Sequence, residues 1–108
     1  MKEYKMQNTQ NESLSKVDEM FCELKKNKKL ALMPFIMAGD PNIEITSEIL
    51  LKLQENGADL IELGIPYSDH LADGPVIQVA ASRALKSGTS LRKVIKLLDS
   101  LKLSLIHI

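Results

Sequence analysis

The chain has 108 residues, of which 44% are hydrophobic and 26% are charged, values typical of a folded globular protein. Its 14 basic residues equal its 14 acidic residues, so the charge balance argues against the basic surface of a nucleic-acid-binding protein. The single cysteine, Cys22, excludes an internal disulfide framework, and no apolar run approaches the length of a membrane span.

The first part of the chain is polar and then helical in pattern. Residues 1–12 lack an apolar signal core and are expected to be a flexible N-terminus without a cleaved targeting peptide. From Ser13, apolar residues recur at every third or fourth position, which predicts an amphipathic helix. The helix is expected to end in the lysine-rich residues 25–29, because cations suit the end of a helix dipole.

Two strand–helix units follow. Residues 30–38, LALMPFIMA, are continuously apolar, which predicts a strand buried on both faces, although proline is unusual in a central strand. Asn42 is expected to cap a helix that Asn56 and Gly57 end. Residues 59–65, DLIELGI, predict a second strand.

Two helices complete the pattern. Pro75 is expected in the first turn of a helix that stops at Gly88, and Thr89 or Ser90 is expected to cap the last helix. The side chains expected to face the core of the three helices after residue 41 are Ile45, Ile49, Leu50, Leu53, Val76, Ile77, Ala80, Ala81, Ala84, Leu85, Leu91, Val94, Ile95, Leu98 and Leu101.

The order of elements predicts an α/β fold with a parallel sheet, because strands alternate with helices. Two parallel strands alone would leave two open edges and an uncovered apolar face. The sequence is therefore expected to be the first part of a larger domain, and the 108-residue chain by itself is expected to be inactive.

The stretch ELGIPYSDHLADGP at residues 62–75 carries the candidate functional groups, because functional loops in parallel α/β folds follow the carboxyl ends of strands. Glu62 lies near such a strand end, and its alternative is a structural ion pair with a lysine or arginine. Asp73 precedes a predicted helix, and its alternative is a helix cap. Phe35 is either core or the wall of a pocket, and Asp69 is by default a turn residue.

The segments PFIMAGDP at 34–41 and GADLIELGIPYSDHLADGPVIQ at 57–78 resemble the tryptophan synthase alpha chain family, with similarity from about residue 14 to residue 102. The resemblance implies that residues 13–102 are the N-terminal portion of a (β/α)₈ TIM barrel, a fold of about 250 residues. It also implies a carbon–oxygen lyase of tryptophan biosynthesis, which cleaves indole-3-glycerol phosphate by a retro-aldol reaction to indole and glyceraldehyde 3-phosphate.

The same resemblance implies roles for single residues. Glu62 would transfer protons, Asp73 would face the indole N–H, and Phe35 would line the indole pocket. The family needs no metal or cofactor, since pyridoxal phosphate belongs to a beta chain that completes an α₂β₂ tetramer. The residues expected to contact that beta chain are Tyr67, Asp69 and His70.

Two departures from the family pattern stand out. His70 stands where the family has proline or occasionally alanine, and a single base change, by sequencing error or by real variation, converts a proline codon to a histidine codon. A real histidine is expected to weaken coupling to the beta chain, because proline restricts the loop backbone. Residues 103–108, LSLIHI, do not continue the helix pattern, and their back-translation is compatible with a sequencing adaptor. They are therefore expected to be an artefact outside the fold.

Two other functions compete with the lyase function. A non-catalytic module that binds the beta chain is the alternative to the lyase, whereas another barrel enzyme acting on a phosphorylated sugar is disfavoured by the signature at residues 62–75. The isoleucine- and lysine-rich composition resembles that of cyanobacterial or algal-plastid members of the family. The expected compartment is therefore the cytoplasm or the plastid stroma.

Overall fold

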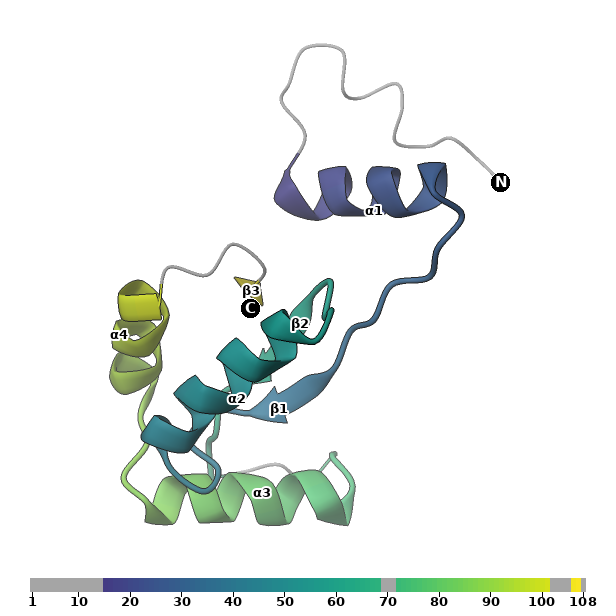
Figure 1. Cartoon of the computed structure of the whole chain (residues 1–108). Coiled ribbons are helices and arrows are strands. Elements are labelled where there is room, and N and C mark those ends of the chain that lie inside the picture. Colours follow the sequence, from purple (N-terminus) through teal and green to yellow (C-terminus); the bar gives the residue numbers. More distant parts are fainter. Residues whose placement is uncertain (1–14, 69–71, 102–105, 108) are drawn as a thin grey trace. The chain divides into compact units, whose positions relative to one another are not determined.

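The computed structural model describes residues 15–68, 72–101 and 106–107 (Figure 1). The chain divides into two compact units, residues 1–31 and residues 32–108, and each is described by itself. Ser13, Asp69 and His70 therefore lie outside the described residues, as does the predicted flexible segment 1–12.

The first unit contains helix α1, Lys16–Lys26. Ser15 caps it, because the Ser15 hydroxyl accepts a hydrogen bond from the Asp18 backbone N–H at 3.1 Å and Asp18 bonds back in a capping box. Lysines in the last turn suit the helix dipole, as predicted, and acidic residues in the first turn suit it as well. Cys22 is exposed on this helix.

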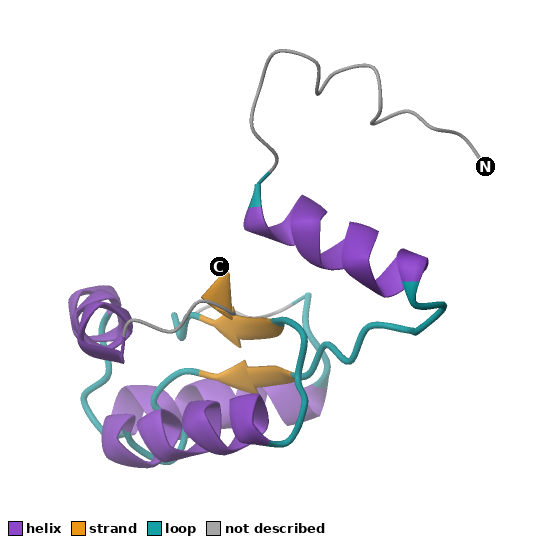
Figure 2. Cartoon of the chain, turned by 45° about the horizontal axis from the view of Figure 1, so that its top comes forward, coloured by secondary structure: helices purple, strands orange, loops and turns teal. Residues whose placement is uncertain are grey.

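The second unit is a parallel sheet with three helices (Figure 2). The described strands are β1 (Phe35–Met37), β2 (Ile61–Gly64) and β3 (Ile106–His107), hydrogen-bonded in the order β1-β2-β3. The helices are α2 (Ile43–Glu55), α3 (Pro75–Lys86) and α4 (Leu91–Leu101). The alternation of strands and helices and the parallel pairing confirm the α/β prediction.

Strand β1 is much shorter than the predicted strand over residues 30–38, which is a correction. Pro34 has no N–H to donate, and only its carbonyl pairs with β2, accepting from the Glu62 N–H at 2.9 Å. Leu32 bonds to Asp59 through both its backbone groups, so the segment before β1 runs beside β2 without forming a regular ladder. Leu30, which belongs to the first unit, is 94% exposed.

The two faces of the sheet differ, because successive side chains of a strand point to opposite sides. Ile61 and Leu63 face α2 and α4 and form the main buried cluster with the core side chains Ala38, Leu50, Ala58, Val94 and Leu97. The opposite side, called here the Glu62 face, carries Phe35, Met37, Glu62 and Gly64. Burial of β1 on both faces is therefore wrong for Phe35, which is 42% exposed.

Helix α3 covers part of the Glu62 face. Its alanines Ala80, Ala81 and Ala84 are buried against Met37 of β1, with Ile77 beside them. Small side chains let the helix backbone approach the strand closely. The predicted core role of these alanines is confirmed.

Several other predicted core positions are wrong, because the described elements cover only one side of each helix. The exposed ones are Ile45, Val76, Leu85, Leu91 and Ile95. Thr46, which the sequence analysis did not place in the core, is completely buried. Its hydroxyl accepts from the Gly39 N–H at 2.8 Å and donates to the Asn42 carbonyl at 2.9 Å, which satisfies both groups inside the fold.

The helix ends follow local chemistry. Asn42 caps α2 as predicted, with its side-chain oxygen accepting from the Ile45 N–H at 2.9 Å. Pro75 is the first residue of α3, also as predicted. The Ser90 hydroxyl accepts from the Lys93 N–H at the start of α4, whereas Thr89 is buried.

A third strand lies in the segment that the sequence analysis assigned to an artefact. Ile106 pairs with Ile61 and His107 pairs with Glu62, both in parallel register. This corrects the expectation that the chain holds only two strands. That residues 103–108 derive from a sequencing adaptor stays a prediction.

Candidate active site

Glu62 and Phe35 lie side by side on the Glu62 face. They are register partners across the β1–β2 ladder, so their side chains leave the sheet on the same side. The Glu62 side chain is exposed, and it takes no part in the ion pairs that join described residues. Within the described part of the chain, the alternative of a structural ion pair therefore has no support.

The ring of Phe35 lies over Gly64, two positions beyond Glu62. A Cβ atom built on Gly64 would be 2.6 Å from Phe35 Cζ and 3.3 Å from Met37 Cε. Carbon atoms pack at about 3.5–4.0 Å, so the ring occupies space that only glycine leaves free. Gly64 thus determines where the ring stands beside Glu62.

Asp73 lies immediately before α3 and is half-buried. The N-cap of α3 is Gly74, and no side chain makes the cap hydrogen bond. The alternative of Asp73 as the helix cap is therefore wrong. Instead, the backbone carbonyl of Asp73 accepts a hydrogen bond from Gln78 Nε2 at 2.8 Å.

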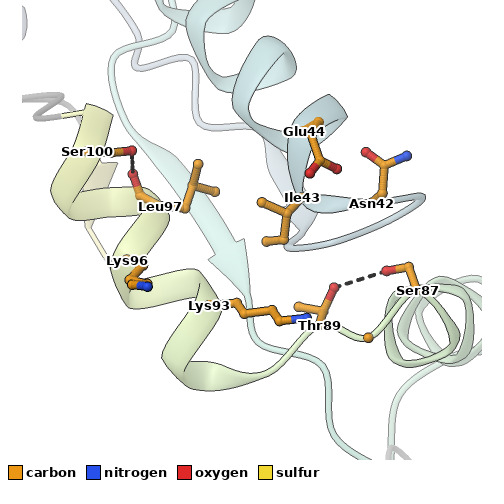
Figure 3. A pocket seen from close by; sticks show the side chains of 10 residues that line it. Asn42, Ile43, Glu44, Ser87, Thr89, Lys93, Lys96, Leu97 and Ser100 are labelled. Carbon is orange, nitrogen blue, oxygen red and sulfur yellow. Dashed lines mark hydrogen bonds between the residues drawn. The ribbon is translucent and has the colours of Figure 1, made fainter.

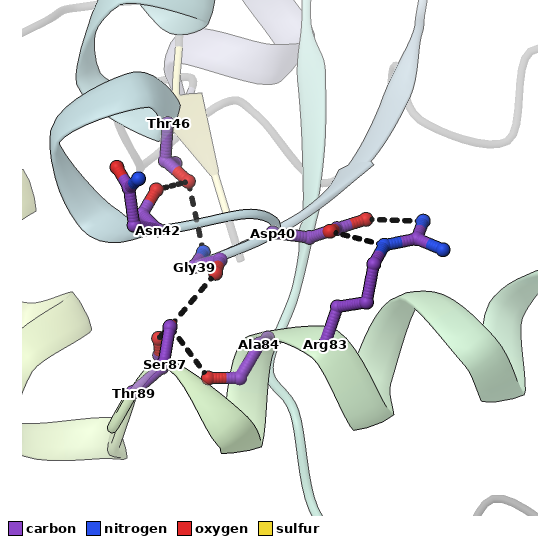
Figure 4. Close-up of polar contacts among 8 residues, drawn as sticks. All are labelled: Gly39, Asp40, Asn42, Thr46, Arg83, Ala84, Ser87 and Thr89. Carbon is purple, nitrogen blue, oxygen red and sulfur yellow. Dashed lines mark hydrogen bonds and ion pairs between the residues drawn. The ribbon is translucent and has the colours of Figure 1, made fainter.

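Polar contacts fix the far end of α3 to the loop after β1 (Figure 4). Arg83 donates from Nε and from a terminal nitrogen to the two carboxylate oxygens of Asp40, at 2.7 and 2.9 Å. The bidentate geometry is specific to the guanidinium group, and the hydrogen bond and charge of Asp40 raise the pKa of Arg83. The single hydroxyl hydrogen of Ser87 is shared between the Ala84 carbonyl at 2.8 Å and the Gly39 carbonyl at 3.2 Å.

Of the candidate residues, the structure brings Phe35 and Glu62 together. Phe35 and Glu62 share a face, and α3, which starts beside Asp73, packs over Met37 on that same face. Tyr67 is 54% exposed in the loop after β2. The remaining predicted contact residues, Asp69 and His70, lie outside the described ranges.

Sequence reasoning missed Gln78 and the pair of Asp40 and Arg83. Arg83 and Asp40 are 43 positions apart, and no local pattern links them. The signal for Gly64 was visible only as an isolated glycine in a strand, which suggests close approach of another group without naming it.

A separate hollow of about 510 Å³ lies between the start of α2, the turn after α3 and α4 (Figure 3). It contains none of the predicted site residues, and Lys93, Lys96 and Glu44 are the charged side chains that line it. No cluster of three metal-ligating side chains occurs within the described ranges. Nor is any described helix both long and apolar enough to cross a bilayer.

The comparisons with known proteins agree on one family. The sequence model of the family described as tryptophan synthase alpha chain matches residues 21–107. The chain belongs to this family. The alpha chain of Prochlorococcus marinus subsp. pastoris is 78% identical over 92 residues, and that of Geotalea daltonii is 48% identical over 89 residues.

Solved structures of alpha chains have the same fold. The subunit from Legionella pneumophila is 40% identical, with a TM-score of 0.80 over 83% of this chain and 34% of that protein. Tryptophan synthase from M. tuberculosis gives 30% identity and a TM-score of 0.76. The chain spans about a third of the length of the relatives it matches, for example 33% of the P. marinus protein.

The described structure is thus the first part of a TIM barrel, as predicted. In such a barrel, helices cover the outside, and alternate strand residues point inward. Helices α2 and α4 cover the other side of the sheet, and α3 contacts the Glu62 face at Met37, the last residue of β1, so we assign the part of this face around Phe35 and Glu62 to the barrel interior. This explains why Glu62 and Phe35 are exposed in a chain that holds a third of the barrel.

Proposed function

We propose that this chain contributes the two catalytic carboxylates of an alpha chain that cleaves indole-3-glycerol phosphate to indole and glyceraldehyde 3-phosphate. The observation that carries the proposal is the Glu62 side chain on the interior face, without an ion pair to a described residue, beside the ring of Phe35. The second proposed carboxylate, Asp73, precedes the N-cap of α3, a helix that packs against Met37 on the same face.

The retro-aldol reaction needs proton transfer at two places. A proton is added to indole C3, which gives a cationic indolenine. The bond between C3 and the glycerol chain then breaks, its electron pair returns to the ring, and the adjacent hydroxyl loses a proton as the aldehyde forms. One proton enters and one leaves, so no net acid or base is consumed.

Glu62 would transfer these protons, since an acid on the interior face can reach the reacting carbons and the hydroxyl. Asp73 would accept a hydrogen bond from the indole N–H and stabilise the positive charge of the indolenine. Phe35 would form a wall of the indole pocket. A positioned acid or base typically contributes about 10²–10⁴-fold in rate.

The proposal includes the beta chain as partner, in an α₂β₂ tetramer whose pyridoxal phosphate belongs to the beta chain. The exposed Tyr67 supports a contact loop after β2, and Asp69 and His70 belong to the same proposed loop. The proposed compartment is the cytoplasm or the plastid stroma, in keeping with similarity to Prochlorococcus relatives.

The test uses a full-length chain, because the relatives are about three times as long. The present sequence is continued after Leu101 with the remaining residues of the 78%-identical P. marinus protein. Indole release from indole-3-glycerol phosphate is then measured for the parent and for the variants Glu62→Gln and Asp73→Asn. Glu48→Gln is the matched control, since Glu48 is exposed on α2, the helix that packs on the opposite side of the sheet from Glu62.

We expect both site variants to lose at least about 100-fold in kcat, while the control keeps the parent activity. Normal activity of Glu62→Gln would refute the assigned role. A folded parent that releases no indole but stimulates a beta chain would refute the lyase and favour the non-catalytic binding module.

A further inference from the structure

The Gln78 side chain is hydrogen-bonded to the backbone of Asp73, one of the two proposed catalytic carboxylates. It lies in the first turn of α3 and is half-buried, and its Nε2 donates to the Asp73 carbonyl at 2.8 Å. The first hydrogen bond of the helix runs from the Gln78 N–H to the Gly74 carbonyl at 3.0 Å. The Asp73 carbonyl therefore lies outside the helix ladder, and the Gln78 side chain reaches back to bind it.

The helix that carries Gln78 is itself fixed to the sheet. Its buried alanines pack against Met37 of β1, and its last turn is joined to the loop after β1 by Arg83 and Ser87. The Gln78 side chain thus connects the Asp73 peptide to a helix anchored at the end of β1 and on the loop that follows it. Gly74, which follows Asp73, has no side chain to restrict the backbone at this point.

We propose that Gln78 is a positioning residue for Asp73, acting through the hydrogen bond to its backbone carbonyl. The inference rests on the proposed lyase function. A bound peptide plane limits how the Asp73 carboxylate is presented to the substrate, and a displacement of about 1 Å at a catalytic group can cost about 10²-fold in rate.

The decisive experiment is a double-mutant cycle in the full-length chain, with Gln78→Met, Asp73→Asn and the double variant. Methionine keeps the length of glutamine and removes the donor. We expect Gln78→Met to lower kcat about 10-fold with little change in KM, and to lower it no further in the Asp73→Asn background, because its effect passes through the Asp73 carboxylate. Equal losses in both backgrounds would overturn the inference.

Gln78→Glu supplies a second readout, the pH dependence of kcat, which a purely structural role would leave unchanged. At pH 8 the added carboxylate has no proton to donate and repels the Asp73 carbonyl, so kcat falls. Burial and the neighbouring acid raise the pKa of such a glutamate above its usual value of about 4.3. As the pH falls, the protonated form regains a donor, so the deficit relative to the parent shrinks.

A deficit of Gln78→Glu that is the same at pH 8 and pH 5.5 would count against the hydrogen bond. Gln54→Glu on α2 is the matched control and is expected to follow the parent at every pH. Because the parent is assayed beside every variant, failure of the lyase proposal appears as an inactive parent. Failure of the present inference appears as an active parent with unaffected or additive Gln78 variants.

Discussion

Gly64→Ala tests whether the close approach of Phe35 to β2 shapes the barrel interior. The new Cβ would lie 2.6 Å from Phe35 Cζ and 3.1 Å from Cε2. An ordinary carbon contact needs about 3.5 Å, so the ring has to move by about 1 Å or the strands have to separate. The Gly64 backbone is not in the left-handed region, so the steric clash is the main cost.

The expected magnitude follows from overpacking, which typically costs about 1–3 kcal/mol. In a full-length chain of about 250 residues, each kcal/mol lowers Tm by about 2–4 °C. We therefore expect Gly64→Ala to lower Tm by about 2–12 °C, because both ranges multiply. Since Phe35 is proposed to form a wall of the indole pocket, KM for indole-3-glycerol phosphate should also rise.

The assay is a cycle with Phe35→Leu, measured by thermal unfolding and steady-state kinetics. Leucine lacks both ring atoms that approach Gly64 most closely. The Gly64→Ala substitution should therefore be nearly neutral for Tm in the Phe35→Leu background. An equal Tm loss with phenylalanine and with leucine would refute the steric argument.

Two further predictions concern local backbone geometry and a helix cap. Gly39→Ala should cost about 3 kcal/mol or more in urea unfolding, because φ is +88° and the new Cβ overlaps the Thr89 side chain. Gly57→Ala, with φ of +98° and no neighbour within 4 Å, should cost only about 1 kcal/mol, and an equal cost at both sites would contradict the steric contribution at Gly39. Asn42→Ala should cost about 1 kcal/mol in the same assay, since it leaves the Ile45 N–H without its cap, while Asn42→Ser should restore most of the loss.

Local chemistry explains which elements could be predicted. The capping side chain of Asn42 and the proline at the start of α3 act on neighbouring backbone groups. Their effects can therefore be predicted from residues close together in the sequence. The alternation of strands and helices follows from periodicity alone. The length of β1 was overestimated, because apolar composition does not distinguish a ladder residue from one such as Leu30, which is 94% exposed.

Burial depended on which elements meet in space. Val76 fits the apolar stripe of α3 but is 78% exposed, whereas Thr46 is completely buried with its hydroxyl bonded. Periodicity identifies one face of a helix, but the width of the buried stripe depends on the neighbours that cover it. Here those neighbours are the described strands and helices of a third of a barrel.

The candidate site divides in the same way. The sequence by itself determined the order of elements and, through the family resemblance, the identity of Glu62, Asp73 and Phe35 as candidates. Only the tertiary structure decided that Gly64 sets the position of the Phe35 ring and that Gln78 holds the Asp73 carbonyl. The physical reason is that hydrogen bonds and steric contacts of a few ångströms depend on how separate elements pack, which residue spacing along one element does not specify.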